Sequence, residues 1–408
     1  MSSSLPQPTV NIGMVGHVDH GKSTLTKALT GRKTDIHSEE VKRGISIKLG
    51  YADTPVYICE TGEKVYSGTK LNDDCRLSRV ISFVDAPGHE TLMATMLSGS
   101  SIMDGALLVI AANEKCPQPQ TREHLTAIEI MGIRNIIIVQ NKIDLVTKER
   151  AIESFNEIKN FVRGSAAENS PIIPVSAYHN RNIHKIFEAI ETFIPTPERN
   201  LTIDPVMYVA RSFDVNRPGI TPDKLKGGVL GGSLTAGIIR VGQEVEIAPG
   251  IKQIKGNKET WENVQTECTA LMAGSNSYES IIPGGLSAVG TKLDPSITKN
   301  DGLAGRILSV AGKAPPVTSS VEINTNLLKR VVGFDNDMNV ELIKTRESLM
   351  LTFGTSNTLG VVTNSRESNI EISLRIPVAV RPDERVAIAR RIANRWRLIG
   401  YGNIVSFA

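Results

Sequence analysis

The chain has few of the features that mark secreted or membrane proteins. Its four cysteines, Cys59, Cys75, Cys116 and Cys268, are irregularly spaced among 408 residues. Such sparse cysteines predict a reducing compartment and no disulfide framework. No apolar run approaches the length that spans a bilayer, and residues 1–9 contain no hydrophobic signal core. We therefore expect a cytoplasmic protein without membrane contact.

The chain also has little excess charge and no repetitive sequence. Its net charge of +3 is too small to indicate nucleic acid binding, which would require a local basic patch. Tandem repeats and low-complexity tracts are not evident. The apolar fraction of 40% and the charged fraction of 22% are ordinary for a globular protein. Because 408 residues exceed a single core, we expect two or three domains.

The strongest motif is a glycine-framed loop between an apolar strand at residues 10–15 and a helix-like segment at 24–29. This arrangement predicts a P-loop that holds a nucleoside triphosphate. Its glycines let backbone N–H groups converge on phosphate oxygens, and the helix N-terminus adds partial positive charge. Lys22 would reach the β and γ phosphates, and the Ser23 hydroxyl would ligate Mg²⁺. The expected nucleotide-binding residues of this loop are Gly16, His17, Val18, Asp19, His20, Gly21, Lys22, Ser23 and Thr24.

Two further apolar strands end in residues that suit a guanine nucleotide. The strand at residues 80–84 leads into Asp85, whose carboxylate would hold Mg²⁺ through water, and into a turn with Gly88. The strand at 135–140 leads into Asn141-Lys142-Ile143-Asp144. The Asp144 carboxylate can accept from the guanine N1–H and exocyclic amine, while Asn141 and the Lys142 stem support the base. Adenine lacks this donor pair, so we expect GTP or GDP.

Two weaker segments complete the predicted site. Backbone N–H groups of Ser176 and Ala177 would meet the guanine oxygen, and Ser46, in Arg43-Gly44-Ile45-Ser46, would offer its hydroxyl to Mg²⁺. Each segment alone is more typical of an ordinary loop, but the order of all five along the chain favours the nucleotide site. For Asp19, a role near the metal and a solvated loop carboxylate both remain open.

The sequence texture changes after Pro195-Thr196-Pro197. Strands alternate with helical segments before it, which predicts an α/β P-loop domain whose mostly parallel sheet carries helices on both faces. Short β-rich runs follow, separated by Gly and Pro turns, which predict two all-β barrel domains. The expected domains are residues 1–200, with an insertion at about 51–79, then residues 201–318 and 319–408.

These motifs carry a family resemblance. Residues 16–23, 43–46, 85–89, 117–124 and 141–144 resemble the translational GTPases of the elongation factor Tu class. Within that class, the chain is similar to the γ subunits of archaeal and eukaryotic initiation factor 2. That closer likeness lies in residues 94–99, 103–106, 116–120, 211–216 and 395–400, and it extends over essentially the whole chain.

The resemblance implies a GTPase that carries methionylated initiator tRNA to the small ribosomal subunit and assembles with α and β subunits. It also implies a catalytic role for His89, which would orient the attacking water, alongside Lys22 and Asp19. Val18 and Ile45 match the apolar pair that screens this histidine in the resting state.

The sequence departs from the family in two places. Many relatives carry a four-cysteine zinc knuckle within residues 51–79, where this chain has only Cys59 and Cys75. Two thiolates do not complete the tetrahedral site of zinc, although Asp73 could contribute, so we expect no zinc. Ser46 stands in place of the usual threonine but keeps the hydroxyl oxygen.

Other interpretations remain open. An elongator-type or selenocysteine-type tRNA carrier would use the same switch, a sulfate-activation GTPase subunit would share the architecture, and a scaffold would bind GTP but scarcely hydrolyse it. The basic run at residues 390–397 is interpreted as a barrel strand with Trp396 in the core, in preference to a surface on which a base stacks.

Overall fold

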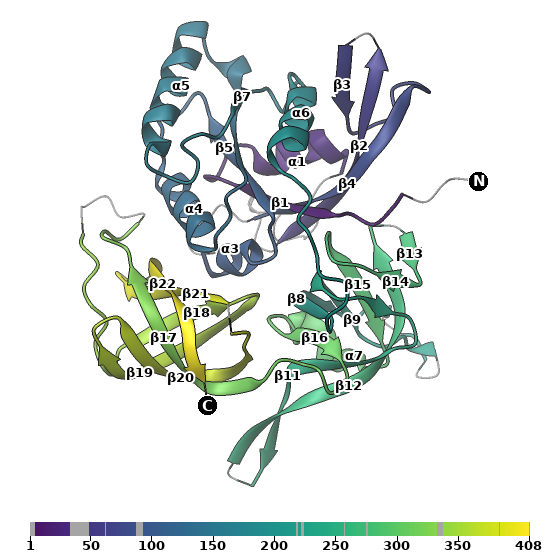
Figure 1. Cartoon of the computed structure of the whole chain (residues 1–408), viewed down its shortest axis with the longest axis vertical. Helices are drawn as coiled ribbons and strands as arrows, with labels where there is room; N and C mark the ends of the chain where they lie inside the picture. Colours follow the sequence, from purple (N-terminus) through teal and green to yellow (C-terminus); the bar gives the residue numbers. More distant parts are fainter. Residues whose placement is uncertain are drawn as a thin grey trace. The chain divides into compact units, whose positions relative to one another are not determined.

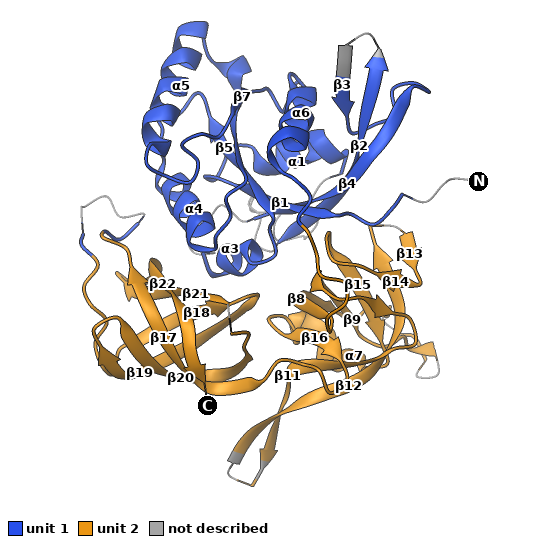
Figure 2. Cartoon of the chain, in the orientation of Figure 1, with its two compact units in different colours: residues 1–197, 330–339 blue, residues 198–329, 340–408 orange. Residues whose placement is uncertain are grey.

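The structure is a computed structural model with two compact units. It describes residues 5–32, 49–61, 63–86, 93–217, 219–221, 224–256, 258–274, 276–332, 338–382 and 384–407. The first unit comprises residues 1–197 and 330–339, and the second comprises residues 198–329 and 340–408 (Figure 2). Among the described helices, none is long and apolar enough to cross a membrane.

A seven-stranded sheet forms the centre of the first unit, in the order β3-β2-β4-β1-β5-β6-β7 (Figure 1). Strands β4, β1, β5, β6 and β7 run parallel, and β2 and β3 add antiparallel pairs at one edge. The strands are β1 (Val10–Val15), β2 (Gly50–Thr61), β3 (Glu63–Ser67), β4 (Cys75–Asp85), β5 (Gly105–Ala111), β6 (Ile136–Asn141) and β7 (Ile172–Pro174). The mostly parallel sheet predicted from the sequence is confirmed.

Helices cover this sheet on both sides. The helices are α1 (Lys22–Thr30), α3 (Met93–Ser100), α4 (Pro119–Ile130), α5 (Lys148–Val162), α6 (Ile183–Phe193) and the short 3-10 helix η2 (Ile143–Leu145). Helix α6 repeats apolar residues every three or four positions and buries Ile186 and Ile190 against the strands, together with Leu25 of α1. Helices α3, α4 and α5 lie on the other side (Figure 1).

The antiparallel edge contains a disulfide bond that the sequence analysis did not expect. Cys59 of β2 lies directly opposite Cys75 of β4 in the strand register, and the two sulfurs are bonded. Both cysteines are buried. The prediction that the chain has no disulfide is therefore wrong, because strand pairing brings together two cysteines that are 16 positions apart. Neither sulfur is then a free thiolate, and the absence of zinc stays a prediction.

Reduction of this bond should destabilise the first unit. Closing a loop of about 15 residues stabilises a fold by about 3 kcal/mol in the chain-entropy model, so reductant should lower the thermal midpoint of the wild-type chain. The thermal midpoint of the Cys59→Ala/Cys75→Ala variant should be the same with and without reductant. The control is Cys116→Ala/Cys268→Ala, which removes the free cysteines and should keep the sensitivity. Four titratable thiols in unreduced, denatured wild-type protein would contradict the bond.

The second unit begins with a closed β-sheet. Its strand order is β11-β16-β8-β9-β15-β12-β13, and a further pairing between β11 and β12 closes the ring. These strands are β8 (Val206–Phe213), β9 (Val229–Ala236), β11 (Glu244–Lys255), β12 (Lys258–Ala273), β13 (Asn276–Tyr278), β15 (Ser287–Thr291) and β16 (Ile307–Val310). Strands β10 (Ile239–Arg240) and β14 (Ser280–Ile281) pair separately, and helix α7 (Pro295–Thr298) and 3-10 helix η4 (Lys299–Asp301) precede β16.

A second closed barrel follows, in the order β17-β20-β19-β18-β21-β22. Its strands are β17 (Val317–Leu327), β18 (Ser348–Phe353), β19 (Ser356–Arg366), β20 (Asn369–Ala379), β21 (Arg385–Ile392) and β22 (Arg395–Phe407). Buried and exposed residues alternate along most of β19, as expected for a strand with one face toward a core. The prediction of two all-β barrels is confirmed.

The basic run lies on the β21–β22 hairpin, but its inward residues differ from the expectation. Trp396 is half-buried, whereas Arg397 is only 7% exposed. Ile399 belongs to the barrel core, whereas Trp396 does not. The pairing of β21 with β22 shifts register at the Leu398–Gly400 step, which interrupts the regular alternation that the sequence predicts. The placement of Trp396 in the core was wrong.

Candidate nucleotide-binding site

The predicted P-loop connects the end of β1 to the start of α1. Gly16 follows β1 with φ +138°, and a Cβ there would lie 2.3 Å from the carbonyl oxygen of Val109. Gly21 precedes α1 with φ +91°, and a Cβ there would lie 2.4 Å from the side-chain nitrogen of Asn141. Glycine is favoured at both positions, because their positive φ values strain other residues and a Cβ would collide with the Val109 carbonyl at Gly16 and with the Asn141 amide at Gly21.

Lys22 holds the loop in a tight turn. Its ammonium donates to the carbonyl oxygens of Gly16 at 3.0 Å and His17 at 2.8 Å. The buried Lys22 side chain thus lies inside the loop that it is predicted to serve. Ser23 is half-buried at the first turn of α1, and Thr24 is exposed beside it. The N–H groups at this helix start form the kind of site that binds phosphate.

In the middle of the loop, one residue is buried and the other three are more accessible to solvent. His17 and Val18 are half-buried, and Asp19 is exposed with φ 61°. His20 is buried, and its Nδ1 lies 3.1 Å from the carbonyl oxygen of Val109. Burial lowers the pKa of His20 to about 3, so its imidazole is neutral near pH 7. Nδ1 then carries the proton and donates to Val109.

Asn141 joins the loop to two other predicted segments. Its amide nitrogen donates to the His20 carbonyl at 2.9 Å, and its amide oxygen accepts the Ala177 N–H at 3.1 Å. Asn141 is buried at the end of β6, and Lys142 follows in a left-handed conformation with φ 61°. One side chain therefore connects the P-loop, the Asn141–Asp144 turn and the Ser176–Ala177 turn.

The base-recognition segments differ in how accessible they are. Asp144 is exposed in η2, with one carboxylate oxygen 3.8 Å from Nε2 of His179. The Ala177 N–H is donated to Asn141, and the Ser176 N–H is donated to the carbonyl of Arg181 at 3.3 Å. Contact of these two N–H groups with a guanine oxygen, as expected from the sequence, would require both hydrogen bonds to be shared or exchanged.

The predicted magnesium ligands are only partly within the described structure. Asp85 ends β4 opposite Met14 of β1, so it lies at the same sheet edge as the P-loop and is fully buried. The Asp85 carboxylate and the Ser23 hydroxyl are hard oxygen donors, which fit Mg²⁺. Ser46, Gly88 and His89, together with Ile45, lie outside the described residues.

His124, the last residue of the motif at residues 117–124, also belongs to this site, although the sequence predicts no role for it. It lies in α4, is 2% exposed, and its Nδ1 accepts the N–H of Gly16 at 2.9 Å. Burial lowers its pKa to about 3, which keeps the imidazole neutral. Thr121, Leu125 and Ile128 are also buried, so His124 interrupts the inward face of α4. A histidine among the inward-facing residues of a predicted helix is the sequence feature that could have indicated this residue.

The low pKa of His124 predicts acid sensitivity. Between its ordinary pKa of 6.5 and the folded value of about 3, only the unfolded chain takes up the proton, so stability falls as pH falls through this range. Going from pH 6.5 to about 5.5, His124 alone should cost the nucleotide-free protein about 1 kcal/mol of unfolding free energy.

Urea unfolding at both pH values would measure this effect. The pKa values of His17 and His20 are also lowered, so these residues add their own pH dependence, and the comparison is with His124→Asn, which removes only the His124 imidazole. The variant should lose less stability than the wild type on acidification. Parallel pH profiles would contradict the assignment.

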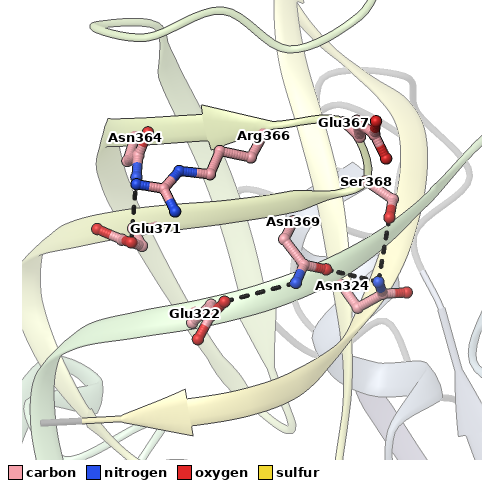
Figure 3. Close-up of a pocket in the computed structure, with 8 residues that line it drawn as sticks. All are labelled: Glu322, Asn324, Asn364, Arg366, Glu367, Ser368, Asn369 and Glu371. Atoms are coloured by element: carbon pink, nitrogen blue, oxygen red, sulfur yellow. Dashed lines mark hydrogen bonds between the residues drawn. The ribbon is translucent and has the colours of Figure 1, made fainter.

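A separate polar hollow of about 310 Å³ lies on the second barrel of the second unit (Figure 3). Its side chains are partnered with one another, for example Asn324 with Asn369 at 2.6 Å and Asn364 with Glu371 at 3.2 Å. It is lined by Glu322, Asn324, Asn364, Arg366, Glu367, Ser368, Asn369 and Glu371. It contains none of the predicted site residues.

Comparisons with known proteins agree with this geometry. Residues 7–196 match the family model of the elongation factor Tu GTP binding domain, and residues 319–404 match that of initiation factor eIF2 gamma, C terminal. The fold and the P-loop therefore define a GTPase of the translational class.

Relatives narrow the class further. The chain is 66% identical to translation initiation factor 2 subunit gamma of Thermoplasma volcanium, over 98% of both chains. It is 55% identical to the protein of that name from Methanococcus maripaludis, over 98% of this chain and 99% of that one. The chain thus belongs to the family of translation initiation factor 2 γ subunits. It is a GTPase that binds GTP and GDP.

Solved structures with a similar fold are more distant in sequence. A bacterial selenocysteine-specific elongation factor, EF-Sec, matches with a TM-score of 0.75 at 23% identity, over 98% of this chain and 59% of that one. Elongation factor SelB from Methanococcus maripaludis, solved with the GTP analogue GppNHp, matches with a TM-score of 0.73 at 22% identity, over 99% of this chain and 80% of that one. At these identities the likeness shows the fold alone.

Proposed function

We propose that this chain is the γ subunit of a heterotrimeric initiation factor that carries methionylated initiator tRNA to the small ribosomal subunit in the cytoplasm. One observation supports the proposal most: Asn141 forms hydrogen bonds both with the P-loop and with the turn predicted to contact the base. The chain that contains this arrangement is similar to a γ subunit over 98% of both chains. Assembly with α and β subunits is proposed on the same likeness. The domains proposed are residues 1–200, 201–318 and 319–408.

In the proposed cycle, the P-loop residues hold the phosphates and Asp144 selects guanine. Lys22 exchanges its carbonyl partners for the β and γ phosphates, while N–H groups at the start of α1 bind phosphate oxygens. Ser23, Ser46 and Asp85 would hold Mg²⁺, with Asp19 near them; when bound, this ion neutralises charge on the phosphates. His89 orients the water that attacks the γ phosphate, and hydrolysis releases the tRNA.

Filter binding tests the proposal directly. The purified chain, with its α partner, should retain methionylated initiator tRNA more strongly with GTP than with GDP, because the γ phosphate stabilises the tRNA-binding state. Elongator aminoacyl-tRNA and selenocysteinyl-tRNA are the comparisons that separate initiation from the other carriers. Equal retention of all three, or equal retention in GTP and GDP, would contradict the proposal.

Guanine selection by Asp144 has its own test. Replacing Asp144 with Asn removes the charged acceptor for two guanine donors, so GDP affinity should fall by about 10- to 100-fold while xanthosine diphosphate affinity rises. Calorimetric titration with both nucleotides measures the change. Asp73→Asn, which alters an exposed aspartate away from the loop, should leave both affinities unchanged. Retained guanine preference in the Asp144 variant would overturn the assignment.

A further inference from the structure

His124 and Gly16 are brought into contact from distant parts of the chain. The imidazole reaches from α4 to the first residue of the P-loop, and the 2.9 Å bond to the Gly16 N–H is buried at both ends. Because the N–H is the donor, Nδ1 carries no proton and Nε2 does. A neutral imidazole in this tautomer is thus an acceptor with a fixed direction.

Gly16 is the point where strand geometry changes into the loop. Its N–H is bonded to His124 and its carbonyl oxygen to the Lys22 ammonium at 3.0 Å, and a Cβ at this position would lie 2.3 Å from the carbonyl oxygen of Val109. The peptide on its N-terminal side therefore has its direction set by His124. A change in that direction would move the carbonyl that positions Lys22, which is the group predicted to meet the phosphates.

The far end of the loop is held differently. His20 is fixed by the carbonyl of Val109 and by the amide of Asn141. His124 acts at the entrance and Asn141 acts near the exit, so the loop is clamped at both ends before a ligand arrives. A site whose donors are already aligned loses less free energy in ordering when the nucleotide binds.

We propose that His124 is a positioning residue of the nucleotide site, which presets the entrance of the P-loop through the Gly16 N–H and thereby raises affinity for guanine nucleotides. It does not touch the reacting atoms. The inference deepens the proposed function and rests on the nucleotide site described above.

Leucine and asparagine substitutions separate this role from simple core packing. His124→Leu fills the space but leaves the Gly16 N–H without an acceptor, whereas His124→Asn keeps an acceptor oxygen at the position of Nδ1. We expect the Leu variant to bind GDP about 10-fold or more weakly, and the Asn variant to remain within about 3-fold of wild type.

The experiment is calorimetric titration of GDP into the full chain with Mg²⁺ present, together with thermal unfolding of each variant. Ile128→Ala is the matched control, since it removes a buried side chain from the same helix without touching Gly16. It should lower the midpoint of unfolding and leave GDP affinity unchanged. If His124→Leu does not fold, His124→Gln replaces it, because its amide lies one bond further out and misses the Gly16 N–H.

The outcomes are distinct. Weak binding by Leu or Gln, rescued by Asn, supports the proposal. Wild-type affinity in the Leu or Gln variant, or equal weakening in Asn, overturns it and leaves His124 as a packing residue. Wild-type protein that binds no guanine nucleotide would instead overturn the proposed function itself.

Discussion

The P-loop between β1 and α1 has peptide groups that are buried away from water, and each of these groups needs a hydrogen-bond partner inside the protein. This constraint organises the first unit. The Gly16 N–H is paired with His124, and the His20 carbonyl is paired with Asn141. The partners come from α4 and β6, so the loop's shape depends on elements far from it in sequence.

The same burial sets the electrostatics of the loop. Two imidazoles, that of His20 in the loop and that of His124 beside it, are neutral because desolvation disfavours their charged forms. Positive charge near the loop is then concentrated on the Lys22 ammonium and the helix start rather than spread over a ring of histidines. A triphosphate would meet a charge at one defined place, which favours alignment as well as attraction.

Sequence periodicity and turn chemistry were enough to predict the sheet, the P-loop and the two barrels, because these depend on local patterns of apolar residues and glycine. Three features depended on tertiary register instead. Cys59 and Cys75 meet only because β2 and β4 pair in one alignment, and β22 shifts register beside Arg397, which is buried where Trp396 is half-buried. The partner of His124 could not be predicted, since the pattern of buried residues on one face of a helix does not show which loop that face contacts.

Asn141 has a consequence for how specificity in this chain can vary. Because one amide group bonds both His20 in the P-loop and Ala177 in the neighbouring turn, the positions of these two segments are coupled. A substitution of Asn141 would therefore remove a partner of the His20 carbonyl and of the Ala177 N–H at the same time. Asp144, the residue predicted to recognise guanine, is exposed and makes neither of these hydrogen bonds, so its substitution would leave both in place.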